Sequence, residues 1–175
     1  GIYGSTLDGS GNVLGALNII NESSINMGSA SDINNMIMGI YGTQNVNISN
    51  LIGSISGGNY TTGIYSSGGS VTHGSSIILG DASVGIYASA GTGTVNAGAV
   101  ITVGNGVRKI VAGNEVIESG VALYANNGAV LTNNSSNITV GRDSIIGYSK
   151  DAGSKIINHG NVSLGEEAIG FYTSG

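Results

Sequence analysis

One short stretch of the chain, residues 105–119, concentrates side chains that could contact a partner. Its four charged residues are Arg108, Lys109, Glu115 and Glu118. The whole chain has only 5 basic and 10 acidic residues, so this stretch differs from its surroundings. Val107 to Val111 and Glu115 to Glu118 flank Ala-Gly-Asn, a pattern that indicates a projecting hairpin. Such an insertion is either a recognition element or a solvated decoration.

Two acids could form a carboxylate pair if the chain repeats every 24 residues. Asp143 and Glu167 have that separation, as do Arg142 and Glu166, for which we expect a surface ion pair. Glycoside hydrolysis needs two acids on either side of a bound sugar, usually in a groove. The chain has no Trp platform and no supporting cluster of charges. We therefore predict no catalytic residue there.

Other candidates for metal binding or catalysis are few. His73 and His159 each precede a glycine, and we expect both at solvated corners. Residues 8–12, Asp-Gly-Ser-Gly-Asn, are similar to the start of a calcium loop, but Ile19 stands where the bidentate Glu belongs. A tight turn is expected instead. With no cysteine and no nucleophile elbow, the sequence predicts a protein that is not an enzyme and has no cofactor and no metal.

The composition excludes several fold classes and several classes of partner. The 175 residues include 32 Gly and no Pro, with 40% hydrophobic and 9% charged residues, which excludes collagen and charge-rich disorder. The net charge of -5 and the absence of a basic cluster longer than Arg108-Lys109 argue against nucleic-acid binding. No apolar run approaches the roughly 20 residues of a membrane span. Since the chain starts at Gly1 without a leader, we expect a segment of a longer protein.

An internal repeat organises the chain. Most tyrosines follow Gly-Ile or a close variant, as in Gly85-Ile86-Tyr87. The seven that share this setting are Tyr3, Tyr41, Tyr65, Tyr87, Tyr124, Tyr148 and Tyr172. The undisturbed period is 24 residues, with one interval of 22, and the two longer gaps are a period plus an insertion.

Each period contains three short alternating segments separated by Gly, Asn or Ser, which is strand and turn chemistry. Three strands in 22 to 24 residues predict one coil of a right-handed parallel β-helix, and the chain as a whole about seven coils. The leucine spacing and helical return of leucine-rich repeats are missing. We expect a single all-β solenoid over 1–175 with insertions near 8–18, 29–38 and 105–119.

Strict alternation predicts which side chains fill the solenoid. Val84, Ile86 and Ala88 should face inward, with Tyr87 outward. The first predicted core column is Met38, Thr62, Val84, Val121, Ile145 and Ile169, and the second is Ile40, Ile64, Ile86, Leu123, Gly147 and Phe171. Stacked side chains of like size would fill a narrow interior.

The same alternation sets a row of aromatic rings on the outside. The candidate aromatic stripe comprises Tyr65, Tyr87, Tyr124, Tyr148 and Tyr172. These rings could contact sugars or apolar peptide, or they could stabilise neighbouring coils by offset stacking, at about 0.5 to 1.5 kcal/mol a pair. The sequence leaves both roles open.

The repeat resembles those of a known family. The pattern Asn-x-Gly, Ile-x-Val-Gly and Gly-Ile-Tyr-Ala, clearest in Val95 to Gly104 and Ser76 to Ala88, is similar to the passenger repeats of type V autotransporters. The likeness is strongest to the large fusobacterial-type outer-membrane adhesins, and it covers essentially the whole chain apart from the insertions.

The resemblance implies an exported passenger displayed on the bacterial cell surface, either anchored in the outer membrane or secreted. It would adhere to a host or bacterial surface protein or glycan and would contact the membrane only through a C-terminal β-barrel outside these residues. The resemblance thus implies a β-helical stalk that mediates cell-cell or host attachment. The alternative is a polysaccharide-active β-helical enzyme or carbohydrate-binding module.

Overall fold

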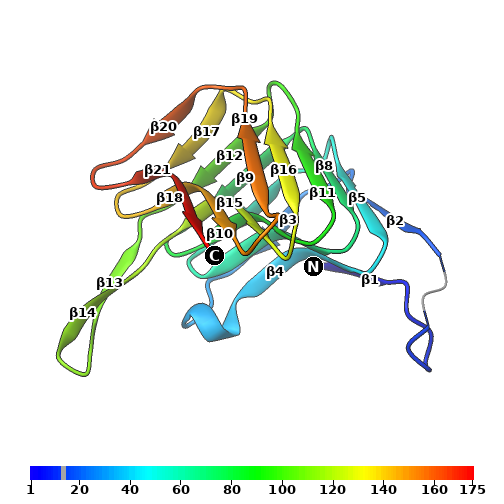
Figure 1. Cartoon of the computed structure of the whole chain (residues 1–175), viewed down its shortest axis with the longest axis horizontal. Helices are drawn as coiled ribbons and strands as arrows, with labels where there is room; N and C mark the ends of the chain where they lie inside the picture. The colour runs from blue at the N-terminus through cyan, green and yellow to red at the C-terminus, as the bar shows by residue number, and fades with distance from the viewer. Residues whose placement is uncertain (13–14) are drawn as a thin grey trace.

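The computed structural model describes residues 1–12 and 15–175, and its regular structure is almost entirely β. Nineteen of the strands form three long parallel sheets, and each complete coil contributes one strand to each sheet (Figure 1). Sheet 1 consists of β1 (Ile2–Ser5), β4 (Ile37–Thr43), β7 (Thr61–Ser67), β10 (Val84–Ser89), β15 (Val121–Asn126), β18 (Ile145–Lys150) and β21 (Ile169–Ser174). Sheet 2 consists of β2 (Leu17–Ile20), β5 (Val46–Asn50), β8 (Ser70–His73), β11 (Thr92–Val95), β16 (Val130–Asn133) and β19 (Lys155–Asn158). Sheet 3 consists of β3 (Ile25–Met27), β6 (Ile55–Gly57), β9 (Ser76–Leu79), β12 (Val100–Val103), β17 (Asn137–Val140) and β20 (Val162–Leu164).

The chain passes from sheet 1 to sheet 2 to sheet 3 and then begins the next coil. Six coils are completed in this way, and β21 is the first strand of a seventh. The register follows the predicted repeat: Tyr87 pairs with Tyr124, and Tyr148 with Tyr172. The parallel β-helix predicted from the sequence is confirmed.

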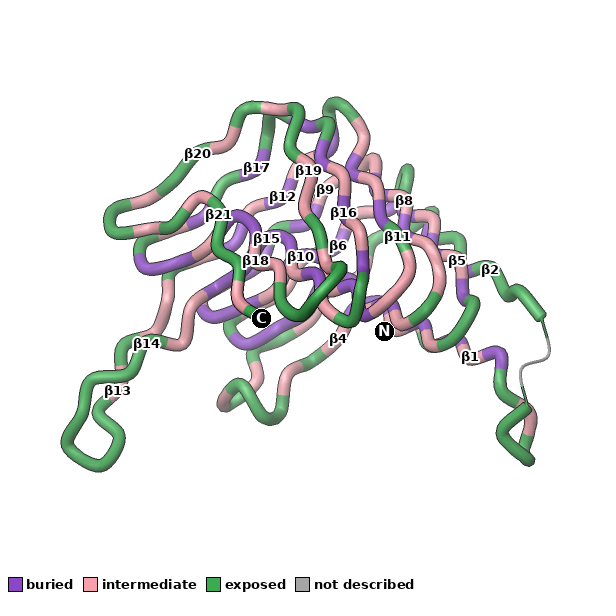
Figure 2. The backbone as a smooth tube through the Cα atoms, viewed as in Figure 1, coloured by how far each residue is buried: buried purple, intermediate pink, exposed green. Residues whose placement is uncertain are grey.

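The interior is a stack of aliphatic side chains. Ile40, Ile64, Ile86 and Leu123 form one buried column, as predicted. Gly147 continues this column, and the Phe171 ring of the next coil lies over the space beside it. Burial is densest in the middle coils and decreases toward both ends (Figure 2).

The other predicted core column was placed on the wrong side of sheet 1. Thr62, Val84 and Val121 are in register as expected, but they lie on the outer face with the tyrosines. The core cluster instead contains their neighbours Ala122 and Ile146. The misplaced residues are Met38, Thr62, Val84, Val121 and Ile145, together with Ile169, which is in register with Ile145 and 45% exposed.

A local break in the alternation explains this error. Met38 pairs with Thr62 and Ile40 with Ile64. Gly39 and Gly63, which lie between these pairs, are not paired in the strand register. Two successive residues therefore face inward, as at a β-bulge. Glycine suits Gly63, where a Cβ would lie 2.7 Å from the Gly85 carbonyl oxygen, while Ala122 and Ile146 take this position in later coils. The strands bend here to close the coil.

Polar side chains join neighbouring coils at the corner between sheets 3 and 1. Asn59 Oδ1 accepts from the Asp81 N–H at 2.9 Å, and Asp81 Oδ1 accepts from the Asn105 N–H at 2.8 Å. Asn105 Oδ1 in turn accepts from the Arg142 N–H at 2.9 Å. The column satisfies backbone donors that the turn would otherwise leave without partners.

A second polar column is buried at the end of sheet 2, and it includes a histidine that was predicted to be solvated. His73 is fully buried, and its Nδ1 accepts from the Asn50 amide at 3.0 Å. Its proton therefore lies on Nε2, which faces the Val100 carbonyl at 3.4 Å. His159 is exposed, because the register aligns His73 with the position of Asn158 rather than with His159. Burial lowers the pKa of His73.

The insertions agree in part with the predicted bounds. Residues 13–14 of the first, 8–18, lie outside the described residues, while Asp8 accepts the N–H groups of Ser10 and Asn12 in a tight turn. The second ends at Met36 rather than 38, because β4 already begins at Ile37, and it contains a 3₁₀ turn, η1 (Ile33–Asn35). The third forms the expected hairpin from β13 (Val107–Val111) and β14 (Asn114–Glu118).

The neighbouring isoleucines 145 and 146 provide a test of the inward and outward assignment. Ile146→Ala removes a fully buried side chain, and we expect it to lower the free energy of unfolding by about 2 to 5 kcal/mol. Ile145→Ala, on the outer face, should cost about 1 kcal/mol or less. Chemical denaturation of both variants measures the difference, and equal losses would contradict the assignment.

His73 should make stability depend on pH near neutrality. Because its folded pKa lies below the unfolded value of about 6.5, the unfolded chain binds the proton first as pH falls. Stability is then lost below about pH 6.5, by up to about 1.4 kcal/mol per pH unit, until the folded pKa is reached. We expect His73→Asn to flatten this dependence in unfolding experiments between pH 7 and 5, while the exposed control His159→Asn keeps it.

Candidate functional site

Two of the insertions leave the solenoid at the same corner, between sheets 3 and 1. Residues 29–36 join β3 to β4 at the start of the second coil, and β13–β14 lies between β12 and β15 at the start of the fifth. A corner loop can lengthen without disturbing the strands on either side, so the coil register continues past both. Both insertions therefore border the outer face of sheet 1.

The 29–36 insertion is ordered by its own polar contacts and by one residue that reaches the sheet. Asp32 caps η1 by accepting from the Asn34 N–H at 2.8 Å and from the Asn35 amide. Met36 covers the outer face of β7, where the Thr62 hydroxyl lies 3.9 Å from its sulfur. These contacts fix one wall of the site.

The hairpin is fixed at its base by Arg108. Its guanidinium makes two hydrogen bonds to Asp143, at 2.8 and 2.7 Å, and contacts Glu167 and Glu115. Hydrogen bonding to Arg108 lowers the pKa of Asp143, whose side chain is only 3% exposed. The predicted stacking of Asp143 with Glu167 is thus present, with the arginine between the two acids.

Lys109 extends from the hairpin in the opposite direction along the corner. Its Nζ lies 2.7 Å from Glu118 and 5.0 Å from the ring centre of Tyr60, the one tyrosine outside the repeat. Tyr60 precedes β7, two coils before the strand that follows the hairpin. Arg108 therefore anchors the hairpin base to the following coil, at Asp143, and Lys109 anchors it to an earlier coil, at Tyr60.

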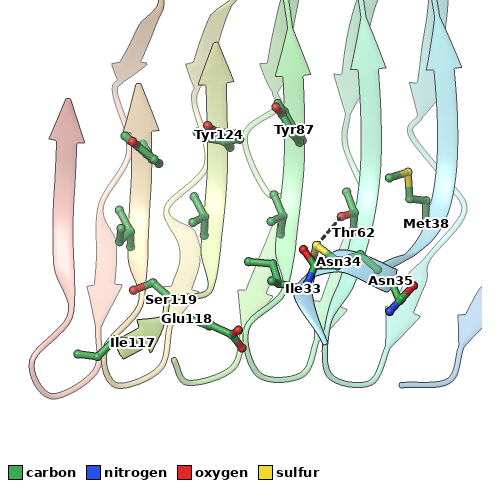
Figure 3. A pocket seen from close by; sticks show the side chains of 15 residues that line it. Ile33, Asn34, Asn35, Met38, Thr62, Tyr87, Ile117, Glu118, Ser119 and Tyr124 are labelled. Atoms are coloured by element: carbon green, nitrogen blue, oxygen red, sulfur yellow. Dashed lines mark hydrogen bonds between the residues drawn. The ribbon is translucent and has the colours of Figure 1, made fainter. Parts of the chain in front are cut away.

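Between the insertions, the outer face of sheet 1 forms a groove of about 680 Å³ (Figure 3). Its floor carries an aliphatic row nearest the corner and a row of tyrosines beyond it. The lining residues are Ile33, Asn34, Asn35, Met36, Met38, Thr62, Val84, Tyr87, Ile117, Glu118, Ser119, Val121, Tyr124, Ile145 and Tyr148. Five neighbouring strands form the floor, which at the usual strand spacing spans about 19 Å.

The rings of the tyrosine column pack against one another along the whole solenoid, near parallel in the first two pairs and tilted or edge-to-face in the other four. Successive ring centres lie between 4.5 Å, for Tyr87 and Tyr124, and 5.4 Å, for Tyr3 and Tyr41. The rings of Tyr41 and Tyr65 are 15° from parallel, so each covers a face of the other. Burial raises the pKa of Tyr124 to about 12, which keeps its hydroxyl neutral at physiological pH. The rings that line the groove are instead tilted, by 57° between Tyr87 and Tyr124 and by 35° between Tyr124 and Tyr148.

The structure places the two predicted sets of partner-contact residues differently. Arg108, Lys109, Glu115 and Glu118 lie together, but all four make ion pairs within the chain. Of the predicted aromatic stripe, Tyr87, Tyr124 and Tyr148 line the groove, while Tyr65 and Tyr172 do not. A partner contact for either set remains a prediction.

Sequence reasoning missed the aliphatic floor of the groove. Its residues had been assigned to the core, yet a signal was present in Met38-Gly39-Ile40, Thr62-Gly63-Ile64 and Val84-Gly85-Ile86. A glycine repeated at one strand position indicates a bulge. The expected ion pair of Arg142 with Glu166 does not form among the described residues; Arg142 instead lies 3.6 Å from Asp143.

The groove has few titratable groups among its lining residues. Its titratable lining groups are Glu118, which Lys109 neutralises, and the three tyrosines. Over residues 1–12 and 15–175, no group of three or more His, Cys, Asp or Glu residues could hold a metal ion. In the same ranges no helix is long and apolar enough to cross a bilayer. No family model, curated protein or solved structure matches the chain.

Arg108→Gln should release the hairpin without unfolding the coils. We expect faster amide hydrogen exchange over 107–118, because the two hydrogen bonds to Asp143 are lost, and unchanged protection of β10 and β15. In the unchanged protein, acid should have the same effect as pH falls from the ordinary Asp value of about 3.9 toward the lowered pKa of Asp143. Arg142→Gln is the control, and equal exchange in the two variants would contradict the role of Arg108.

Proposed function

We propose that this chain is a segment of a surface-displayed adhesin passenger, similar to those of type V autotransporters, and that it binds a protein partner in the groove on sheet 1. The bacterial cell surface, with the passenger outer-membrane anchored or secreted, is the proposed location. The observation that carries the proposal is an apolar groove bordered by two insertions on an otherwise regular solenoid. The likeness of the repeat to adhesin passengers supports the surface location.

The chemistry of the groove favours a protein segment over a glycan. The aliphatic row of Val84, Val121 and Ile145 offers an apolar strip, while stacking of a sugar on tyrosine needs a ring face that is open. Here the ring centres of the groove tyrosines are only 4.5 and 4.9 Å apart, which leaves no room for a sugar ring between them. An extended chain with apolar side chains would cover the strip and meet the tyrosine hydroxyls with its polar groups.

The alternative of a polysaccharide-active enzyme receives less support. Its best carboxylate pair, Asp143 and Glu167, shares one guanidinium and lies outside the groove lining. A general acid must hold a proton near neutral pH, whereas Arg108 lowers the pKa of Asp143. The proposed function is therefore attachment without catalysis.

A binding assay on intact cells tests this proposal. Beads coated with the chain should bind cells that display the partner, and Val84→Glu or Ile33→Glu should weaken binding about tenfold or more, because each buries a charge against the bound segment. Ile52→Glu is the matched control, since Ile52 is 70% exposed and lies outside the groove.

Treatment of the target cells distinguishes the class of partner. Protease treatment should abolish bead binding, and glycosidase treatment should leave it. If glycosidase abolishes binding while the groove variants still bind, the protein-binding groove is wrong and a carbohydrate-binding module takes its place.

A further inference from the structure

Both sides of the hairpin carry apolar residues that its own molecule leaves exposed: by the register, Ile110 and Ile117 lie on one side and Val111 and Val116 on the other. Ile110 is 71% exposed and Val111 is 55% exposed, and Val116 and Ile117 on the opposite strand are also exposed. Isolated two-stranded ribbons are marginal in water, and clusters of exposed aliphatic residues usually mark a contact site. The outer part of β13–β14 projects away from the coils (Figure 1) and is exposed along its length (Figure 2).

The hairpin cannot fill the groove beside it. Arg108, bonded to Asp143, and Lys109, over the Tyr60 ring, fix its base to the corner on both sides, and the strands run outward from there. Only Ile117, Glu118 and Ser119, at the returning end of the hairpin, border the groove. One molecule thus presents an apolar ridge and an apolar groove that do not meet each other.

We propose that the groove on sheet 1 is occupied by the β13–β14 hairpin of a second copy of this chain. This inference rests on the proposed function and names the protein partner as the same protein, so that attachment joins identical molecules. Both elements lie at the same corner and on the same side of the solenoid. Each copy can therefore donate its hairpin and receive its partner's in one closed two-fold contact.

Size and charge agree with this occupant. The part of the hairpin beyond Lys109, Ile110 to Glu115, extends about 10 Å, so it fits within the roughly 19 Å of the groove floor. The tip, Val111 to Asn114, has no charged residue, and the groove floor has none either. Glu118 at the wall is already paired with Lys109, and Glu115, opposite Ile110 on the hairpin, with Arg108, so docking would leave neither carboxylate without a partner. Association despite the net charge of -5 per chain is thus compatible with the local chemistry.

Sedimentation of the purified chain over a range of concentrations tests the contact. We expect a monomer-dimer equilibrium that Ile110→Glu weakens about tenfold or more, because the new charge would be buried in the partner's groove. Ile110 is largely exposed, so this variant should unfold like the unchanged chain. Ile52→Glu, at an equally exposed isoleucine, should dimerise normally. A chain that stays monomeric at all concentrations, or a dimer that Ile110→Glu leaves intact, overturns the proposal.

Crosslinking locates the contact, since the chain has no cysteine of its own. A chain with Ile110→Cys mixed with a chain carrying Ile33→Cys should form a mixed disulfide on oxidation, and Ile52→Cys in place of Ile33→Cys should not. Equal crosslinking to the two positions would also overturn the proposal.

The outcomes separate this inference from the proposed function. If the chain stays monomeric and Val84→Glu abolishes cell binding, the groove binds a different protein. In that case the second copy as occupant is wrong, but the proposed function stands. A dimer with the predicted crosslink that binds no cell surface keeps the inference, and the adhesive function fails instead.

Discussion

The structure depends on hydrogen bonding between successive coils in a fixed register. Each strand pairs with the strand one repeat away, so residues of one type recur at one place and form columns: isoleucine inside, tyrosine outside, Asn and Asp at a corner. A shift of one residue would turn every column to the other face, which is why the core fixes the register so firmly. Side chains of like size then stack at about 4.8 Å, and the narrow interior fills without a globular core.

The same register brings two of the insertions to one side of the solenoid. Because the corner between sheets 3 and 1 repeats in every coil, two loops that are far apart in sequence emerge on one side of the rod, three coils apart. The regular sheet between them becomes a floor, and the loops become walls. A repetitive scaffold thus acquires a single non-repetitive site through two local additions, with the remaining coils unchanged.

The charged residues of the hairpin have a different role in the structure from the one that the sequence indicates. In the sequence, Arg108 and Lys109 stand out as surface charges suited to recognition. In the structure they reach in opposite directions, to Asp143 and to Tyr60, and orient the hairpin. The surface that remains for a partner is aliphatic, with Ile110 and Val111 as its most exposed members. The proposed recognition therefore rests on apolar residues that the composition did not distinguish from core residues.

The sequence by itself determined the period, the three strands of each coil, the stacked tyrosines and the hairpin, because each follows from local alternation and turn residues that repeat along the chain. Only the tertiary structure decided that Ile146 rather than Ile145 faces inward, since the bulge arises where the backbones of neighbouring coils approach each other at a corner. It likewise decided that His73 is buried while His159 is exposed, which depends on a one-residue difference in register. The groove is the same kind of feature: its walls come from the second and fifth coils, and the distance between them is set by the stacking of all the coils between.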